Sequence, residues 1–463
     1  MTGDDLRRPG VAGSFFPGEG AALEAEVARL LAGAERRSPP LPSPPVAVIS
    51  PHAGYRFSGA LTAAALAARA GAAPRRIAIL SPAHRHAFRG IALPSAAGYR
   101  LPGDRRIAID TGARQAALTA GLATLRDAAH EMEHGIETQL PFLAALYPEA
   151  QVLPVVIGAA ETGAVAALID LLAGLEGGTF FVLSSDLSHF HTDPDAKRRD
   201  AETARKIETG DHAHLEPQDA CGARGIAGYL ASRTGGGARA LRLGMMNSHA
   251  AGGDAGRVVG YGAWAFHRPG DAMLGAAERA DLLRAARGAL VRRTRTGKAA
   301  EVTPDGIGPR LSTHAASFVT LETGTPGTGW RLRGCVGSLA AQAPLMRDVA
   351  ENAVKAGFSD PRFAPLGAEE LARLRIKVSV LSRPAPLAFA SEEEALAALV
   401  PGESGAILSD GRHRGLFLPQ VWDSLPEPRA FLRGLRRKAG LAEDHWSGTT
   451  RLELFRAEAF GEA

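Results

Sequence analysis

The chain has 463 residues, about three times the ~150 residues typical of one domain, so we expect two or three compact units. Hydrophobic residues make up 45% and charged residues 22%, proportions that exclude a largely disordered chain. The net charge is only +4 and aromatic residues are 6%, without the clustered basic and aromatic residues of a nucleic-acid-binding surface. The longest uncharged stretch, residues 38–55, contains six prolines, so we predict a cytoplasmic protein without a membrane span.

In the first part of the chain, short apolar runs alternate with alanine-rich helical stretches. This alternation is typical of a parallel sheet whose strands are connected by helices. The expected strands cover residues 46–49, 77–80, 152–157, 180–183, 239–245 and 258–266. The expected helices cover residues 60–70, 162–175, 196–209 and 225–233. We therefore predict an α/β domain over residues 1–268.

The second part of the chain has a different order of elements. Residues 269–275, which include Pro269 and Gly270, are the expected linker. A second domain over residues 276–463 would begin with a helix at 276–293. Its expected strands cover 313–321, 330–336, 376–381 and 405–408, and its further helices cover 345–357 and 392–399. Strands and helices in this order predict an α+β domain.

Polar residues follow three of the expected strands in the first domain. Ser50-Pro51-His52 follows the first strand, Ser81-Pro82-Ala83-His84 the second, and residues 184–189, Ser-Ser-Asp-Leu-Ser-His, the strand that ends at Leu183. Ligands of open parallel sheets bind beyond the carboxyl ends of the strands, so we expect these loops to converge. Two neutral imidazoles and a third donor suffice to bind a first-row transition metal.

Cys221 is one candidate for the third donor. It precedes Gly222 and an expected helix, whose positive end would favour the thiolate, although a small buried apolar role is the alternative. Asp186 and His189 could provide a carboxylate and an imidazole for proton transfer, and a turn or helix cap formed by Asp186 is the alternative.

The segment Glu133-His134-Gly135-Ile136-Glu137 is a further candidate. Helical spacing would put His134 and Glu137 on one face, where Glu137 could support a metal-bound histidine. For Glu133 we expect an exposed position on a charged face.

These motifs, together with Leu140-Pro141 and Cys221-Gly222, resemble in order those of the Memo family, whose microbial members are called AmmeMemoRadiSam system protein B. The resemblance covers residues 8–267. It implies a fold similar to that of class III extradiol dioxygenases, metal ligands at His52, His84 and Cys221, and an acid–base pair at Asp186 and His189. Animal Memo continues after its cysteine with Gly-Arg-His-Pro, whereas Gly222-Ala223-Arg224 stands here, so one histidine near the metal is missing.

Residues 276–459 resemble the AMMECR-type domain, AmmeMemoRadiSam system protein A. The resemblance rests on four segments, Arg333-Gly334-Cys335-Val336-Gly337, Gly357-Phe358-Ser359-Asp360-Pro361-Arg362-Phe363, residues 378–382 and residues 415–421. The chain would then be a fusion of proteins A and B. Arg333, Cys335, Asp360 and Arg362 are its candidate residues, as an anion-binding patch or as a structural Asp360–Arg362 pair.

The resemblance implies a radical SAM protein as partner. With two cysteines, this chain has no motif for an iron–sulfur cluster of its own. Our first hypothesis is a redox protein with non-haem iron, or copper as the alternative metal. The second is a non-catalytic binding or scaffold protein for a small molecule or a protein. Extradiol cleavage of a catechol ranks lower because a thiolate replaces the carboxylate ligand of those enzymes, and zinc hydrolysis ranks last.

Overall fold

The computed structural model describes residues 5–37, 40–69, 73–298, 307–325 and 329–462. It divides into two compact units, one formed by residues 1–236 and 240–267 and the other by residues 237–239 and 268–463. Among the described residues, none of the helices has the length and apolar character needed to cross a membrane.

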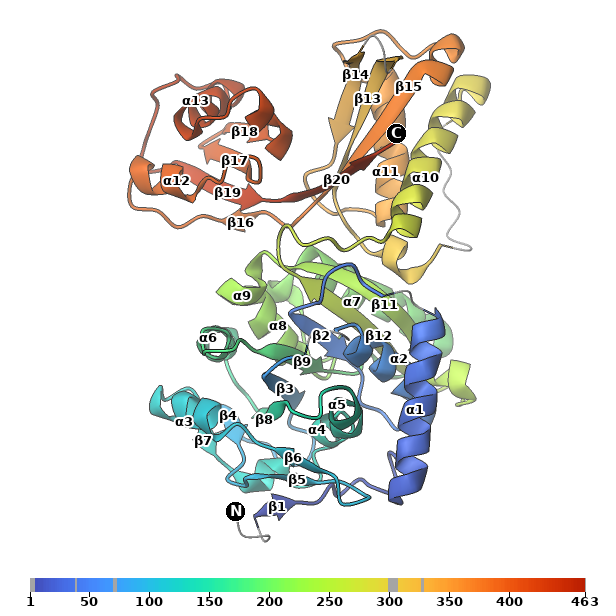
Figure 1. Ribbon diagram of the computed structural model, residues 1–463, viewed down its shortest axis with the longest axis vertical. Coiled ribbons are helices and arrows are strands. Elements are labelled where there is room, and N and C mark those ends of the chain that lie inside the picture. The colour runs from blue at the N-terminus through green and yellow to red at the C-terminus, as the bar shows by residue number, and fades with distance from the viewer. Residues whose placement is uncertain (1–4, 38–39, 70–72, 299–306, 326–328, 463) are drawn as a thin grey trace. The chain divides into compact units, whose positions relative to one another are not determined.

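The first unit is built on a nine-stranded mixed sheet with the order β10-β12-β2-β9-β3-β8-β4-β7, in which β11 pairs with β12 (Figure 1). The strands of this sheet are β2 (Ala47–Ser50), β3 (Arg76–Pro82), β4 (Ile91–Leu93), β7 (Thr124–Leu125), β8 (Gln151–Ile157), β9 (Phe180–Ser184), β10 (His189–His191), β11 (Arg239–Asn247) and β12 (Val258–His267). A separate small sheet contains β1 (Leu6–Arg7), β5 (Gly98–Arg100) and β6 (Arg106–Ala108).

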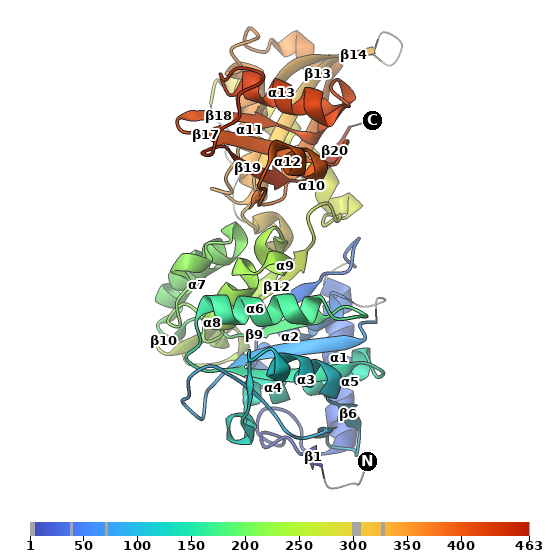
Figure 2. The same ribbon diagram turned by 90° about the vertical axis from the view of Figure 1, so that its left-hand side faces the viewer.

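Helices cover both faces of the large sheet. The helices of this unit are α1 (Gly20–Arg37), α2 (Tyr55–Ala67), α3 (Thr111–Thr119), α4 (His134–Glu137), α5 (Leu140–Leu146), α6 (Thr162–Ala173), α7 (Asp193–Thr209), α8 (Ala223–Ala231) and α9 (Arg233–Gly236). Helices α1, α2 and α5 pack together on one side, and α6 packs on α8 on the other side (Figure 2). The central strands are consequently buried on both faces, which explains their continuous apolar sequence.

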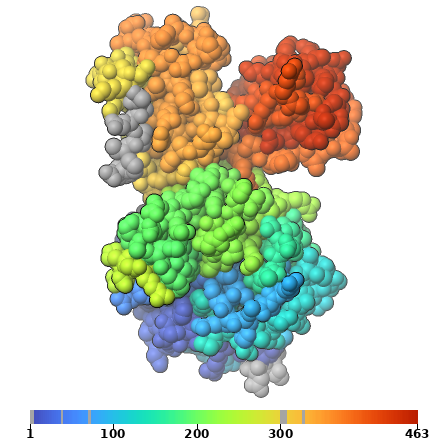
Figure 3. Space-filling view, turned by 180° about the vertical axis from the view of Figure 1, so that it is seen from behind, coloured from blue at the N-terminus to red at the C-terminus, as the bar shows by residue number. Residues whose placement is uncertain are grey.

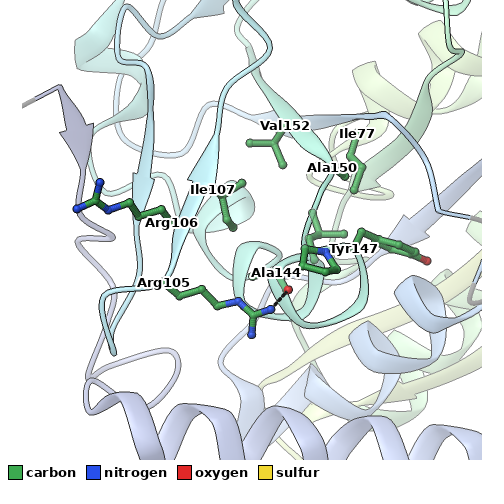
Figure 4. A pocket seen from close by; sticks show the side chains of 10 residues that line it. Ile77, Arg105, Arg106, Ile107, Ala144, Tyr147, Ala150 and Val152 are labelled. Atoms are coloured by element: carbon green, nitrogen blue, oxygen red, sulfur yellow. Dashed lines mark hydrogen bonds between the residues drawn. The ribbon is translucent and has the colours of Figure 1, made fainter. Parts of the chain in front are cut away.

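One cavity of this unit lies against strands β3 and β8 and is very small. Figure 4 shows side chains that line this cavity, among them Ile77, Ile107 and Tyr147, and the hydrogen bond that Arg105 donates to the carbonyl of Ala144. The volume of the cavity is about 10 Å³. A space of that size holds one water molecule at most. It is therefore not a ligand site.

The second unit contains two antiparallel four-stranded sheets. The first has the order β14-β13-β15-β20, with β13 (Ser317–Thr325), β14 (Gly329–Gly337), β15 (Leu374–Leu381) and β20 (Ala457–Gly461). The second has the order β16-β19-β17-β18, with β16 (Ala385–Pro386), β17 (Gly405–Asp410), β18 (His413–Phe417) and β19 (Arg451–Phe455). Its helices are α10 (Ala276–Thr296), α11 (Leu345–Phe358), α12 (Glu392–Ala398) and α13 (Pro428–Lys438).

Several element boundaries differ from expectation. The helix predicted at 60–70 begins at Tyr55, because Tyr55 is buried against Phe16 and Phe142; residue 70 lies outside the described residues. The strand predicted at 313–321 begins at Ser317, since residues 309–312 form a 3₁₀ turn and Asp348 accepts hydrogen bonds from the backbone and hydroxyl of Ser317. Helices α1 and α13 were not predicted.

Candidate metal centre

The carboxyl ends of the central parallel strands bring the predicted ligands together. Strand β9 lies between β2 and β3 and is parallel to both, so the loops that follow these strands meet at one edge. His52 and His84 each lie two residues beyond the end of a strand, and their rings are 4.9 Å apart. Cys221, two residues before α8, places Sγ 3.3 Å from Nε2 of His52. Donor atoms of His52, His84 and Cys221 all lie within 4.8 Å of one another.

Hydrogen bonds fix the tautomer of His52. The hydroxyl of Ser184 donates to the carbonyl of Gly135 at 2.5 Å, so it can only accept from Nδ1–H of His52, at 2.8 Å. The proton therefore resides on Nδ1, and the lone pair of Nε2 points toward Cys221. Burial lowers the pKa of His52 well below its usual value and keeps the ring neutral. His52 is thus ready to bind a cation without losing a proton.

His84 is oriented by a buried carboxylate. Its Nδ1 lies 2.6 Å from Oε1 of Glu133, and its backbone N–H donates to Oε2 at 2.9 Å. Burial opposes charge on Glu133, but the hydrogen bonds from His84 outweigh burial and the pKa of Glu133 is lowered. Because a carboxylate only accepts, His84 carries its proton on Nδ1 and leaves Nε2 as the donor atom.

The position of Glu133 corrects our expectation. It is 1% exposed rather than on a charged surface, because its carboxylate accepts from His84 and from the backbone of Gly135 at the start of α4. Glu137, which we predicted in this supporting role, instead accepts from the backbone of Val11 at 3.0 Å. Helix α4 is a single turn, so the helical spacing on which that prediction rested extends over four residues only.

Cys221 is held by the loop that contains Asp186. The backbone N–H of Asp186 donates to Sγ at 3.2 Å, and the backbone N–H of Cys221 donates to the carbonyl of Asp186 at 3.2 Å. We expected the following helix to favour the thiolate, but Gly222 is its N-cap and burial raises the pKa of the Cys221 thiol strongly. Without a cation the thiol is protonated, and its hydrogen can point to Nε2 of His52 or to the carbonyl of Asp186, 3.6 Å from Sγ; a bound cation would replace that proton.

Asp186 and His189 do not form the predicted pair. Oδ1 of Asp186 accepts from the backbone N–H of His52 at 2.8 Å, and Asp186 is 5% exposed, with its pKa raised by burial to about 7. Nδ1–H of His189 donates to the carbonyl of Leu187 at 2.8 Å, which leaves Nε2 free. Asp186 therefore joins the loops of His52 and Cys221 and does not orient His189. Burial lowers the pKa of His189, so the ring is a neutral base near pH 7.

His134 lies directly against both histidine ligands. Its ring centroid is 4.1 Å from that of His84 and 5.1 Å from that of His52, and Phe15 packs on it at 4.9 Å. Burial lowers its pKa to about 4, so the ring is neutral. The predicted proximity of His134 to the ligands is thus present, in the form of ring contacts that exclude water from one side.

Sequence reasoning missed the supporting roles of Ser184 and Gln139. Gln139 donates to the carbonyl of Pro51 at 3.0 Å and accepts from the hydroxyl of Ser50 at 2.8 Å, which fixes the start of the His52 loop. Both side chains are fully buried. A polar residue directly before an apolar stretch, as Gln139 is before Leu140-Pro141-Phe142, was the available signal.

Two glycines allow the loops to approach closely. A Cβ atom at Gly135 would lie 2.2 Å from Oγ of Ser81 and 3.2 Å from Nδ1 of His52. A Cβ at Gly222 would lie 2.6 Å from the carbonyl oxygen of Ser184. Real Cβ contacts are not this short, so the separation of the histidine and cysteine loops depends on the absence of these two side chains.

Glu137 gives a prediction for stability. Burial raises its carboxyl pKa from 4.5 to about 7. Between these values the unfolded chain loses the proton while the folded chain keeps it, so this group makes stability fall as pH rises from about 4.5 to 7. Glu137→Gln, whose oxygen can still accept from Val11, should be more stable than the unmodified chain by about 1–3 kcal/mol at pH 8. At pH 4 the free energies of unfolding of the two proteins should be equal. Urea unfolding at pH 4 and at pH 8 would measure both differences.

The candidates of the second unit are joined by ion pairs. Arg362 donates to Asp360 at 2.7 Å and 2.9 Å, and Asp360 accepts from the backbone N–H of Cys335 at 2.9 Å. Arg333 pairs with Glu370 at 2.6 Å. The structural Asp360–Arg362 pair is therefore present, and Arg333 is engaged with a carboxylate that we did not single out.

Comparison with known proteins agrees with the motifs. Residues 7–265 match the family model of Memo-like protein, and residues 283–460 match that of AMMECR1. Similar proteins occur in Saccharolobus islandicus (38% identical, 33% of this chain and 69% of that protein) and Thermococcus gammatolerans (36% identical, 39% and 88%). A crystal structure of an uncharacterized Pyrococcus horikoshii protein is 35% identical, with 39% and 89% covered and a TM-score of 0.37. The predicted fusion is confirmed: the chain belongs to the Memo-like protein family and carries an AMMECR1 domain after its Memo-like domain.

Proposed function

We propose that the Memo-like domain is a metal-dependent redox protein that binds non-haem iron, or copper as the alternative, through His52, His84 and Cys221. The observation that carries this proposal is the donor set: two imidazoles whose Nδ1 atoms are engaged by Ser184 and Glu133, and one thiol, with donor atoms within 4.8 Å of one another. A thiolate favours soft or redox-active metals over magnesium. The 3.3 Å between Sγ of Cys221 and Nε2 of His52 suits two ligands of one cation at bond lengths of about 2.0–2.3 Å.

When bound, iron or copper would supply electron transfer at this site. Residues of the chain would orient the ligands and transfer protons. Glu133 and Ser184 hold the two imidazoles in the tautomer that leaves Nε2 free, and His134 and Phe15 exclude water from one side. His189 would accept or donate a proton at Nε2, since its Nδ1 is engaged with the carbonyl of Leu187.

Two apolar side chains adjoin these residues in the chain. Met132 precedes Glu133 and is 49% exposed; Phe190 follows His189 and is 60% exposed. Both residues have left-handed backbones, with φ of 52° and 64°, which is unusual for residues of this size. Exposed apolar groups held at such backbone angles beside polar loops favour a substrate with an apolar portion.

The fusion with an AMMECR1 domain supports a role of both domains in one pathway. We propose a radical SAM protein as the partner, as the AmmeMemoRadiSam resemblance implies. In the alternative proposal, the Memo-like domain binds a modified protein or metabolite for that partner without catalysis. A catechol as substrate of an extradiol-type reaction remains the less favoured version. Metal binding with turnover separates both redox versions from the binding proposal.

The test uses the full chain loaded with iron or copper. We expect about one metal ion per chain, and oxygen consumption with catechols or thiols that depends on the metal. His189→Gln should keep the metal and lose turnover, because it removes the proton acceptor and no ligand. If the chain binds neither metal and His52→Ala changes nothing, the redox proposal is wrong. If metal binds without turnover of any substrate class, the binding role is favoured.

A further inference from the structure

A large cleft in the second unit is separate from the proposed metal centre. Its volume is about 1190 Å³, above the 300–1,000 Å³ range of most small-molecule sites. One wall is the β14-β13-β15-β20 sheet, and the other comprises β18 and the 3₁₀ helix Pro419–Asp423. In Figure 3 a hollow separates the orange and red parts of this unit.

The two walls are fixed relative to one another. Ala316 and Leu381 pack with Ile407 and Phe455 in a small apolar cluster between the two sheets. Across the cleft, the amide of Gln420 donates to the hydroxyl of Ser379 at 3.0 Å. The cleft is therefore a fixed structural feature of this unit.

Strand alternation explains why the sheet wall is polar. On β15, Ile376, Val378 and Val380 are fully buried on the face that packs against α10 and α11. The intervening residues Arg375, Lys377 and Ser379 line the cleft. On this second face Arg375 and Lys377 are part-exposed and open to a ligand, whereas Ser379 is buried and bonded to Gln420 of the 3₁₀ helix.

The charges that line the cleft favour an anion. They comprise five cationic side chains, Arg362, Arg375, Lys377, Arg414 and Lys438, against three carboxylates, Glu322, Asp360 and Asp423. Two of the carboxylates are already paired, Asp360 with Arg362 and Glu322 with Lys377, each at 2.7 Å. Arg414 has only a distant ion pair, 3.9 Å from Glu453, and Lys438 has no ion-pair partner within the described parts of the chain.

Apolar side chains and one thiol complete the lining. Phe318, Leu416, Phe417 and Phe460 offer surfaces for an apolar body. Cys335 lies on the sheet wall opposite Thr320 of β13, whose hydroxyl lies 3.3 Å from Sγ. The glycines of the Arg-Gly-Cys-Val-Gly motif fit this wall: a Cβ at Gly334 would lie 2.1 Å from the carbonyl oxygen of Ala356 on α11.

From these observations we infer that the cleft of the AMMECR1 domain binds an organic anion, a carboxylate or phosphate attached to an apolar body. The acid group would lie near Arg414 and Lys438, which lack close partners, and the apolar body against the aromatic side chains. Cys335 would then be covered by the bound molecule. This inference is independent of the metal centre and of the function proposed for it.

Alkylation of Cys335 in the full chain tests the inference, with the modified peptide quantified by mass spectrometry. Cationic clefts concentrate anions about tenfold or more. For Cys335, the ratio of the alkylation rate with anionic iodoacetate to the rate with neutral iodoacetamide is the quantity to measure. This ratio should be at least about threefold higher than the same ratio for a neutral model thiol. Arg414→Gln with Lys438→Gln should abolish this preference. Arg429→Gln with Arg433→Gln, which removes two exposed charges from α13 outside the cleft, should leave it intact.

Protection from iodoacetamide identifies the ligand chemistry. Phenyl phosphate or benzoate should slow alkylation of Cys335 in a saturable manner, while benzyl alcohol, which has a similar ring and no charge, should not. Stronger protection by one of the two anions assigns the acid group. If neither anion protects, or benzyl alcohol protects equally, the inference is wrong. The same holds if the iodoacetate preference is absent or survives in the Arg414/Lys438 variant.

Discussion

Cys221→Ala should weaken iron or copper binding by the full chain by more than about 100-fold. Loss of a residue that only supports a ligand typically costs about 10–100-fold in metal affinity, and loss of a ligand should exceed that range. Cys221 is also the only donor of the three that gains a negative charge when it binds, so its loss removes the charge that compensates the cation. Titration of the metal against a chromophoric chelator measures the change.

The chain contains its own matched control for this experiment. Cys335, the second of the two cysteines, lies in the other unit and contacts Thr320 and no histidine ligand. Cys335→Ala should therefore leave metal affinity unchanged, while circular dichroism verifies that both variants are folded. Equal affinity of the two variants would falsify the assignment of Cys221 as a ligand.

Gly135→Ala should damage the same site without changing any ligand. The new methyl group would lie 2.2 Å from Oγ of Ser81 and 3.2 Å from Nδ1 of His52, so α4 must move away from strand β3 and from the His52 loop. Overpacking of this kind costs about 1–3 kcal/mol, and displacement of His52 should weaken metal binding by about tenfold or more. Gly135 has no positive φ, so steric contact alone would cause the effect.

Gly163→Ala is the corresponding control in the first unit. Gly163 is in helix α6, where a Cβ atom would have no neighbour within 4 Å, so alanine should stabilise the domain by about 0.5–1 kcal/mol. Urea unfolding measures the stability of both variants, and the chelator titration measures their metal affinity. Both quantities should fall only in Gly135→Ala. If Gly135→Ala keeps normal affinity and stability, the loops tolerate separation and the site is less rigid than the packing implies.

The convergence of His52 and His84 could be predicted because it depends on short-range patterns. Apolar runs such as 46–49 and 77–80, alternating with helical stretches, predict strands buried on both faces, and parallel strands place the residues that follow them at a common edge. His52 and His84 are each two residues past such a strand. This local pattern was sufficient to predict that His52 and His84 lie close together.

The supporting residues could not be predicted in the same way, because their roles depend on contacts distant in sequence. Glu133 looks like any surface glutamate until the β3 loop places His84 against it, 49 positions earlier in the chain. Asp186 was expected beside His189, three residues away, yet its carboxylate contacts the backbone of His52, 134 positions earlier. Sequence spacing favours local partners, whereas buried polar groups bond to whatever the packed fold brings near.

The residues that line the cleft of the second unit also could not be predicted, because they are distant from one another in the sequence. The motif around Cys335 drew attention to Arg333, Asp360 and Arg362, but Arg375, Lys377, Arg414 and Lys438 are scattered over 64 positions and share no motif. Their common location follows from strand alternation in one sheet and from the placement of β18 and α13.

The hydrogen bonds that hold the Nδ1 protons of His52 and His84 are made to the protein's own Ser184 and Glu133. A rigid, preformed set of nitrogen and sulfur donors cannot reject copper or zinc by itself, because these ions bind such ligands more tightly than ferrous iron does at equal concentration. If the proposed site binds a metal, the ion found in purified protein should therefore reflect the growth medium and the expression host. In the native cell, the supply of metal to the newly folded chain, more than the site itself, would decide which ion it carries.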